Sequence, residues 1–412
     1  MYTLSPYYLL FLFCLSICYN CKVQEGKRDQ IKIPQSAKKD LSVIDLDQFL
    51  YVKQNLDSDL FSSEYEELIN EADEALKNGP YSVVNKTKIP PSGDKHDYIS
   101  LGPYWWPDPD KPDGLPWIRR DGEVNPLTRG ENTDIEIKGQ MFRDASSSGL
   151  AYFFSDDKKY RDKALQLLEV WFLNPETKMN PNLNFAQGIP GRSTGRCFGI
   201  IEFTGITNII TTIEVLELKN SMPIETSQGL RSWFSDYLNW LQTSEYGVLE
   251  KTRKNNHATW YDVQVASILL YLDRNDEAKQ VLEDVKTGRI ATQIEPNGEQ
   301  PHEMARTKTL SYSTMNLRGF TQLAFLGTKV DVDLWNYKTQ NGAGIISAFE
   351  FLKPYASGAE KWNYEQISSL ENARKGLKQL FIRAGSQFNV PDYCKVGSIE
   401  GEKANSLLYF CR

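Results

Sequence analysis

The chain repeats a unit made of a helix, a turn with aspartates and a second helix, and this repetition restricts the folds open to it. Residues 152–172, YFFSDDKKYRDKALQLLEVWF, resemble residues 269–285, LLYLDRNDEAKQVLEDV. Each stretch begins with an apolar helix end, turns at an aspartate and continues as a charged amphipathic helix. Helical hairpins that stack in this way form solenoids or closed α/α toroids. The spacing between the units is too irregular for a tetratricopeptide array.

Apolar residues at helical spacing predict helices through much of the remaining chain. The predicted helices cover residues 60–76, 137–154, 161–172, 200–218, 229–243, 256–272, 276–285, 312–326 and 365–381. From Phe388 onward the sequence is polar. There we predict a small β element or no regular element.

Three irregular polar segments interrupt the predicted helices. Residues 96–126 contain six prolines, so no regular element is expected there. This segment is interpreted either as a sugar-stacking wall or as a packed lid. Residues 174–196 are rich in amides and arginines, which suits hydroxyl and carboxylate binding or a turn-rich connector, and residues 289–313 form the third segment. We predict that the three segments form one cleft at one end of a helical toroid.

The first residues predict export. Residues 1–21 carry an apolar run that is too short to span a bilayer and is typical of a secretory signal. A lipoprotein signal cleaved at Cys18 or Cys21 is the alternative. The polar residues 22–41 are predicted to be a linker, and residues 42–412 a single (α/α) toroid domain.

Charge and cysteine content narrow the function classes. The formal net charge of −7 argues against binding nucleic acid by bulk charge, so an anionic substrate would need a local cationic site. The 9 Trp and 21 Tyr suit either sugar stacking or a large helical core. Cys197, Cys394 and Cys411 remain after the signal segment, and their odd number allows one bridge, which we predict between Cys394 and Cys411. The sequence after the signal segment contains no cluster of cysteine and histidine residues that would predict a metal site.

The stretch KNNHATWYDVQ, residues 254–264, has the composition of an active site. Asn256 and His257 precede Trp260 and Tyr261 by one helical turn, so amide, imidazole and aromatic groups can share one face at a helix start. The alternative is that one of the asparagines caps the helix and that His257 is a structural histidine.

Arg306 and Tyr312 are the other chemically suggestive pair. They are six residues apart, about 120° away from a shared face on one helix, so a common site requires Arg306 on a loop or a first turn. With Asn256 and His257 they suit β-elimination from a uronate, in which hydrogen-bond donors and a fixed cation stabilise the dianion that forms at the carboxylate. A nearby arginine favours tyrosinate, so Tyr312 can take the C5 proton and then protonate O4, and His257 is the other candidate base. This chemistry requires no cofactor.

Four blocks within residues 97–326 resemble the alginate lyase superfamily of bacterial polysaccharide lyases, related to family 5 and most similar to family 38. They are YISLGPYWWPDP, MNPNLNFAQGIPGR, NNHATWYDVQVA and ARTKTLSYS. The resemblance implies an (α/α) toroid that cleaves a polyuronate, such as alginate, polymannuronate or glucuronan, by β-elimination. It assigns the family's Asn–His pair to Asn256 and His257, its arginine to Arg306 and its catalytic tyrosine to Tyr312. In family 5 the arginine and the tyrosine are seven residues apart, whereas Arg306 and Tyr312 are six residues apart.

The remaining predictions concern binding and location. The predicted substrate-binding residues are Tyr104, Trp105, Trp106, Arg119, Asn182, Asn184, Gln187, Arg192, Trp260, Tyr261, Glu295 and His302. The expected partner is an anionic polysaccharide and not nucleic acid. We expect a periplasmic or outer-membrane-anchored lipoprotein of a Gram-negative bacterium, without a transmembrane helix in the mature protein.

Two alternative functions stay open from the sequence. Glu295 and Glu303 suggest a glycoside hydrolase, because such enzymes use a pair of carboxylates. A glycan-binding lipoprotein without catalytic activity would explain the export signal and the aromatic loops. It would leave the recurrence of Asn, His, Arg and Tyr within helical runs unexplained.

Overall fold

The computed structural model describes residues 40–398 and 406–411. Contacts divide the chain into residues 1–36 and residues 37–412, and the fold below is that of the second unit. The predicted signal segment, the lipid-anchor positions Cys18 and Cys21 and almost all of the predicted linker lie outside the described residues. Export therefore stays a prediction.

The described elements are mostly helices, with a few short strands. In chain order they are α1 (Leu46–Gln54), α2 (Ser62–Lys77), η1 (Val83–Asn85), β1 (Ile99–Leu101), β2 (Trp105–Trp106), β3 (Ile118–Arg119), η2 (Pro126–Thr128), α3 (Ile135–Ser155), α4 (Lys158–Leu168), η3 (Glu169–Leu173), β4 (Phe185–Gly188), η4 (Cys197–Phe203), α5 (Ile206–Leu218), α6 (Ile224–Thr243), α7 (Glu245–Lys251), α8 (Asn256–Tyr271), α9 (Asn275–Val285), η5 (Lys286–Ile290), α10 (Ala291–Gln293), α11 (Pro301–Met304), α12 (Thr309–Thr328), α13 (Ile345–Ser357), α14 (Leu370–Gln387) and α15 (Pro391–Gly397).

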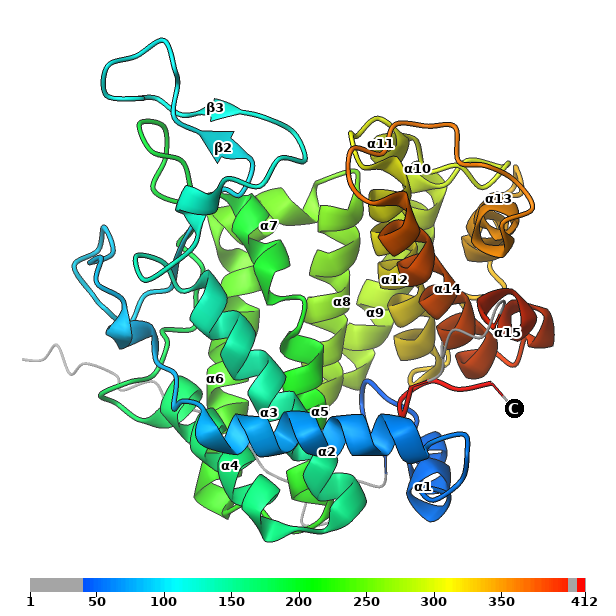
Figure 1. Cartoon of the computed structure of the whole chain (residues 1–412), viewed down its shortest axis with the longest axis horizontal. Coiled ribbons are helices and arrows are strands. Elements are labelled where there is room, and N and C mark those ends of the chain that lie inside the picture. Colours follow the sequence, from blue (N-terminus) through cyan, green and yellow to red (C-terminus); the bar gives the residue numbers. More distant parts are fainter. Residues whose placement is uncertain (1–39, 399–405, 412) are drawn as a thin grey trace, which may run out of the picture. The chain divides into compact units, whose positions relative to one another are not determined.

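One set of helices packs side by side, and a second set packs against the first (Figure 1). In the first set α3 packs on α5, α5 on α8, α8 on α12 and α12 on α14. The second set contains α4, which packs on α3, α9, which packs on α8, and α13, which packs on α14. Nearly every residue of α8 is buried, as a helix with neighbours on all sides requires, whereas α9 buries one apolar face and exposes its acids. The predicted (α/α) toroid is confirmed.

The repeated sequence unit corresponds to two helical hairpins, α3–α4 and α8–α9. Asp156 ends α3 and Asp273 follows α8, and both adopt the left-handed conformation, with φ of 60° and 61°. Aspartate tolerates this conformation better than most residues, so it can stop one helix and reverse the chain. Asp157 then caps α4 by accepting a hydrogen bond from the backbone N–H of Lys159. The two turns are alike because the same residue type ends each first helix.

The prediction of no regular element in residues 96–126 was wrong. β1 pairs in parallel with the distant β4, and β2 pairs antiparallel with β3. The prolines of this segment fall between the strands, so no strand hydrogen bond is lost to a missing N–H. The pairing depends on partners far along the chain or across a loop, which local sequence does not show.

Two predictions near the C-terminus also need correction. The predicted helix over residues 365–381 begins later, at Leu370, because the preceding residues bond to the start of α12: Thr309 N–H donates to Glu365 O, and Ile367 N–H donates to Thr307 O. The polar tail contains a helix, α15, which starts at Pro391 and packs on α14. Proline suits the first position of a helix because its missing N–H has no helical partner there.

The predicted disulfide between Cys394 and Cys411 is present, and Cys197 is buried and free. The two bridged residues are separated by 17 positions, and a bridge over a loop of this length stabilises a fold by about 3 kcal/mol. We expect the double variant Cys394→Ser with Cys411→Ser to unfold at lower urea concentration, with a loss near that value. Reductant should destabilise the wild type and leave the double variant unchanged. An unaltered urea midpoint in the double variant would contradict a stabilising role.

Candidate active site

A cavity of about 500 Å³ opens where the three irregular segments meet the start of α8. Figure 1 shows β2, β3, α10 and α11 at the same end of the helical body. The cavity wall consists of Pro103, Tyr104, Trp105, Arg119, Gln187, Arg196, Phe198, Ile201, Arg253, Asn255, Asn256, His257, Arg306, Tyr312 and Met315. All three segments contribute to this one wall, as the sequence predicted.

The charge of this wall is opposite to that of the chain. Four arginines, Arg119, Arg196, Arg253 and Arg306, line the cavity, and none of the lining residues is an aspartate or glutamate. The whole chain carries a formal charge of −7. A cavity lined by one sign of charge concentrates ligands of the other sign. The wall therefore provides the local cationic site that an anionic substrate needs.

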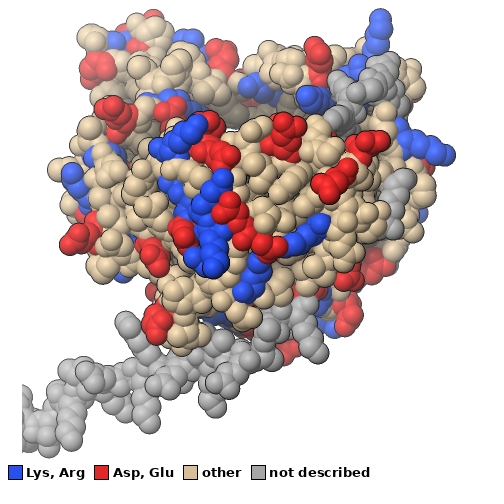
Figure 2. All heavy atoms as spheres, turned by 60° about the horizontal axis from the view of Figure 1, so that its bottom comes forward, with Lys and Arg blue, Asp and Glu red and all other residues tan. Residues whose placement is uncertain are grey.

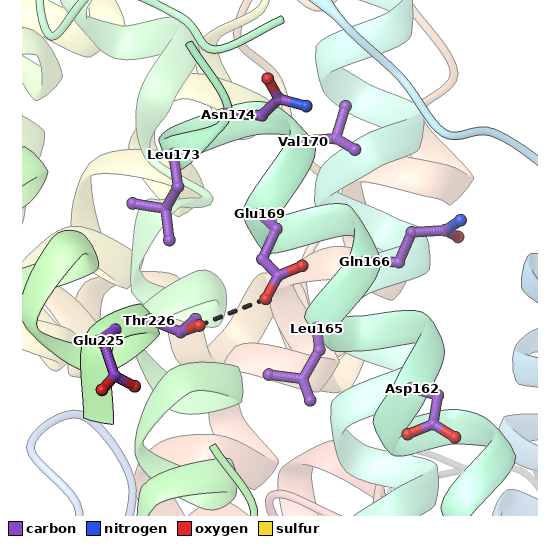
Figure 3. Close-up of a pocket in the computed structure, with 9 residues that line it drawn as sticks. All are labelled: Asp162, Leu165, Gln166, Glu169, Val170, Leu173, Asn174, Glu225 and Thr226. Carbon is purple, nitrogen blue, oxygen red and sulfur yellow. Dashed lines mark hydrogen bonds between the residues drawn. The ribbon is translucent and has the colours of Figure 1, made fainter. Parts of the chain in front are cut away.

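One other face and one other hollow of the described residues differ in charge from this wall. The face shown in Figure 2 carries acidic and basic side chains next to one another, with no broad field of one sign. A hollow of about 580 Å³ between α4, η3 and α6 is larger than the arginine-lined cavity (Figure 3). Three of its lining residues, Asp162, Glu169 and Glu225, are acidic and none is basic, so it does not suit a polyanion. The charge of the lining residues, and not the cavity volume, distinguishes the arginine-lined cavity as the candidate site.

Arg306 and Tyr312 meet as the sequence argument required. Arg306 lies in the turn between α11 and α12, and its Nη2 donates to the Tyr312 hydroxyl at 2.9 Å. Asp121 holds the same guanidinium through two bonds, from Nε at 3.0 Å and from Nη2 at 2.8 Å. The Tyr312 hydroxyl donates in turn to the Tyr104 hydroxyl at 2.7 Å. The guanidinium of Arg306 is thus held between Asp121 and the Tyr312 hydroxyl.

The protonation of Tyr312 differs from the expectation. Burial raises the pKa of Tyr312 far above its ordinary 10.0, and the hydrogen bond to Tyr104 adds to this effect. Arg306 lowers the same pKa but is outweighed. Asp121, which pairs with Arg306, adds a smaller upward shift to the pKa of Tyr312. The phenol of Tyr312 therefore carries its proton at neutral pH.

Asn256 is held by a buried carboxylate. The backbone N–H of Asn256 donates to Glu303 Oε1 and its side-chain Nδ2 donates to Glu303 Oε2, each at 2.7 Å. Burial raises the pKa of Glu303, and the bonds from Asn256 oppose that shift. An amide nitrogen has two hydrogens, so one N–H and the carbonyl oxygen of Asn256 remain for a ligand.

His257 is held in a similar way. Its Nδ1 lies 2.5 Å from Oε1 of Glu250, whose side chain is completely buried. The Phe198 ring packs edge-on against the imidazole, with centroids 4.9 Å apart and an interplanar angle of 84°. These two contacts fix the ring in the cavity wall, where His257 is one of the lining residues.

A buried polar network supports the turn that carries Arg306. Asn316 on α12 donates to Gln293 at 3.1 Å and to Gln300 at 2.9 Å, and Thr259 on α8 donates to Gln293 at 3.0 Å. The Gln300 amide donates to Ser313 O, back on α12. Hydrogen bonds between buried polar groups fix the relative placement of helices. These bonds tie α8, α10, the start of α11 and α12 together behind the site.

Of the predicted binding residues, Tyr104, Trp105, Arg119 and Gln187 line the cavity. Gln187 has a positive φ of 51°, and its side-chain oxygen accepts a hydrogen bond from Arg196 Nη2 at 2.8 Å. Gln187 therefore supports the Arg196 guanidinium in the cavity wall.

Other predicted residues of the first two segments lie outside the cavity wall. The Trp106 indole donates to Glu123 O at 3.2 Å. Each of the others also has a protein partner: Asn182, Asn184 and Arg192. Their polar groups help to hold the segments together.

Trp260 and Tyr261 do not share the cavity face with Asn256 and His257. Both are buried; the Trp260 indole donates to Met315 O, and the Tyr261 hydroxyl donates to Leu241 O. They pack in the core because neighbouring helices cover α8 on all sides.

Glu295 and His302 are exposed and do not line the cavity. Glu303 is buried and bonded to Asn256. The two glutamates thus do not face one another across the cavity as the carboxylate pair of a hydrolase would.

The sequence interpretation missed four residues of the site: Asp121, Phe198, Glu250 and Arg253. Glu250 precedes His257 by seven residues, a spacing that shares a face on one helix, but α7 ends at Lys251 before α8 begins. Asp121 is 185 residues away from Arg306. No local signal links such partners.

Comparisons with known proteins identify the family of this chain. The family model described as alginate lyase matches residues 82–362. The chain belongs to the alginate lyase family. The crystal structure of an alginate lyase from Bacteroides ovatus is 36% identical, with a TM-score of 0.86 over 90% of this chain and 99% of that one. The search of curated proteins finds no match.

More distant members share the fold. Alginate lyase A1-III from Sphingomonas species A1 is 18% identical, with a TM-score of 0.56 over 92% of this chain and 100% of that one. A tyrosine-to-phenylalanine variant of A1-III complexed with tetrasaccharide is 14% identical, with a TM-score of 0.58 over 92% and 99%. The family match and the 36% identical relative show that the chain is a polysaccharide lyase, so the hydrolase and the non-catalytic binder are set aside.

Two further findings concern the described residues alone. There, no single helix is long and apolar enough to cross a membrane, although the bent pair η4 and α5 passes that test together. The same residues contain no group of three or more His, Cys, Asp or Glu side chains placed to hold a metal ion.

Proposed function

We propose that this polysaccharide lyase cleaves a polyuronate of the alginate type, with Asn256, His257, Arg306 and Tyr312 as its reacting set. The observation that carries the proposal is the cavity with four arginines and no carboxylate in its wall. Such a wall binds a chain of carboxylates and repels none of them. The 36% identical relative is named as an alginate lyase, which supports the same polymer class.

The first chemical task is to neutralise the carboxylate next to C5. Two nitrogens of Arg306 are engaged by Asp121 and Tyr312, which leaves Nη1 for the substrate. The second N–H of Asn256 is the other free donor. Donors fixed before the substrate arrives stabilise the developing dianion without reorganisation. Loss of the C5 proton becomes feasible as a result.

The second task is the transfer of two protons. The electrons of the C5–H bond form the C4–C5 double bond, the C4–O4 bond breaks, and O4 takes a proton. Tyr312 carries a proton in the free enzyme and gives it to O4. Where H5 and O4 lie on opposite faces, His257 takes the C5 proton. Where H5 and O4 lie on the same face, Tyr312 first loses its own proton. It then takes the C5 proton and passes it to O4.

The test is a product assay on several polymers. The purified chain is incubated with polymannuronate, polyguluronate, glucuronan and a neutral glucan, and the ultraviolet absorbance of the unsaturated uronate is followed. We expect absorbance with at least one uronate and none with the glucan. Reducing ends without absorbance would mean hydrolysis and would refute the proposal. Binding without any new chain ends would refute it as well.

Replacement of Tyr104 by phenylalanine should move the pH dependence of the reaction. Tyr104 helps to hold the pKa of Tyr312 above its ordinary value, so its removal lowers that pKa. On a substrate with H5 and O4 on the same face, Tyr312 must be deprotonated, and kcat/KM rises with pH. We expect this rising limb to lie at lower pH in Tyr104→Phe. A limb that stays in place would show that Tyr104 does not control the proton on Tyr312.

A further inference from the structure

Glu250 is a buried carboxylate with one strong contact. It lies near the end of α7, is completely buried, and places Oε1 2.5 Å from Nδ1 of His257. Its second oxygen, Oε2, accepts from no N–H or O–H group in the part of the chain that is described, and the Cys197 thiol is a weak donor beside the carboxylate. Two other buried glutamates differ: Glu303 accepts on both oxygens from Asn256, and Glu214 accepts on both from Ser42. Glu250 thus has fewer donors than those two glutamates, and its strongest contact is with the imidazole of His257.

The contact fixes the hydrogens of the imidazole. A carboxylate oxygen accepts and does not donate, so Nδ1 of His257 carries the hydrogen in this contact. A neutral imidazole has one N–H and one acceptor nitrogen, and Nε2 is therefore the acceptor. Within residues 40–398 and 406–411, no protein group bonds to Nε2, and His257 lines the cavity. On the cavity side, His257 therefore presents the lone pair of Nε2 to the substrate and not an N–H.

We propose that Glu250 is a positioning residue that keeps His257 in the tautomer whose acceptor nitrogen is available to the substrate. The inference rests on the proposed function, since it describes how one member of the reacting set is prepared. A carboxylate behind an imidazole also stabilises the imidazolium that forms when Nε2 takes a proton. Glu250 thereby favours proton acceptance by His257 without touching the substrate.

The other groups around Glu250 are consistent with this role. The Cys197 thiol lies nearby, and burial together with the Glu250 carboxylate raises its pKa to about 12, so it stays protonated. Arg196 and Arg253 stack on Phe198 at 4.9 and 4.1 Å from its ring centre. Glu303, the other carboxylate near His257, is bonded to Asn256, so Glu250 is the carboxylate that contacts the ring.

The tautomer can be observed directly. The chain has only three histidines, so nitrogen-15 labelling of histidine gives three ring spin systems, and His257→Asn identifies the relevant one. In the full-length wild type we expect the hydrogen on Nδ1. In Glu250→Gln the side-chain amide can donate to Nδ1, and we expect the hydrogen to move to Nε2. His96, whose Nδ1 contacts Lys178 O at 2.6 Å, is the internal control and should keep its tautomer. An unchanged His257 tautomer in Glu250→Gln would overturn the proposal.

Kinetics give the functional half of the test. Loss of a partner that orients a reacting histidine typically costs roughly 10- to 100-fold, and we expect Glu250→Gln to lower kcat by this factor with little change in KM. Glu250→Asp, which retains the carboxylate, should restore part of kcat. Thermal unfolding shows whether each variant is folded. A folded Glu250→Gln with wild-type kcat would overturn the role of Glu250. An enzyme inactive on every uronate would refute the proposed function, while the tautomer measurement would still test Glu250.

Discussion

Tyr312→Phe is expected to abolish formation of the unsaturated product. The change removes one oxygen, and with it the proton that reaches O4 in either route of elimination. Acid–base groups contribute roughly 10²- to 10⁴-fold, so kcat should fall by about 10³-fold or more. KM should change little, because the arginines of the wall are retained. The measurement is the initial rate of absorbance increase on the best uronate polymer.

The matched control for this variant is Tyr160→Phe. Tyr160 lies on α4, away from the cavity, and its hydroxyl donates to Asp73 at 2.9 Å. Both variants lose one bonded phenolic hydroxyl, but only Tyr312→Phe loses it at the site. We expect Tyr160→Phe to keep its activity. A fully active Tyr312→Phe would remove Tyr312 from the mechanism and leave His257 as the proton carrier.

Arg306→Lys should produce the second large loss, although it conserves charge. Lysine is a point charge on a flexible stem and cannot reproduce the two parallel bonds to Asp121 together with the bond to Tyr312. Removal of one preorganised donor to a developing oxyanion costs roughly 10²- to 10³-fold. We expect kcat/KM to fall by about this factor, with most of the loss in kcat.

A companion variant separates charge from placement. Asp121→Asn keeps Arg306 but weakens the contact that orients it, and it also disturbs the bond from the Thr307 hydroxyl. We expect a smaller loss than in Arg306→Lys, because the guanidinium can still reach the substrate. If Arg306→Lys retained wild-type kcat, simple charge at this position would suffice, and the geometric role of Arg306 would be rejected.

Much of the fold was predictable from local patterns. The apolar spacing predicts α3, α8 and α12 to within a few residues, and the repeated aspartate turns anticipate the α3–α4 and α8–α9 hairpins. The spacing of Arg306 and Tyr312 required a loop or a first turn, and the structure shows a loop. Such features depend on residues close together in the chain, so their physics can be read from sequence. The strands β1 and β4 pair across a long stretch of chain and were missed. The helix α15 was also missed, although it packs on α14, which directly precedes it.

By itself the sequence determined the helical hairpins, the four residues proposed to react and the need for a local cationic site in an acidic chain. Tertiary structure alone decided which arginines form that site and which carboxylates hold the reacting groups. Asp121 reaches Arg306 across 185 residues, and Glu250 reaches His257 across a helix break. It also decided the proton on Tyr312, because burial and Tyr104 outweigh the neighbouring arginine. The physical reason is common to all three: desolvation and charge pairing depend on distances in space, which sequence separation does not supply.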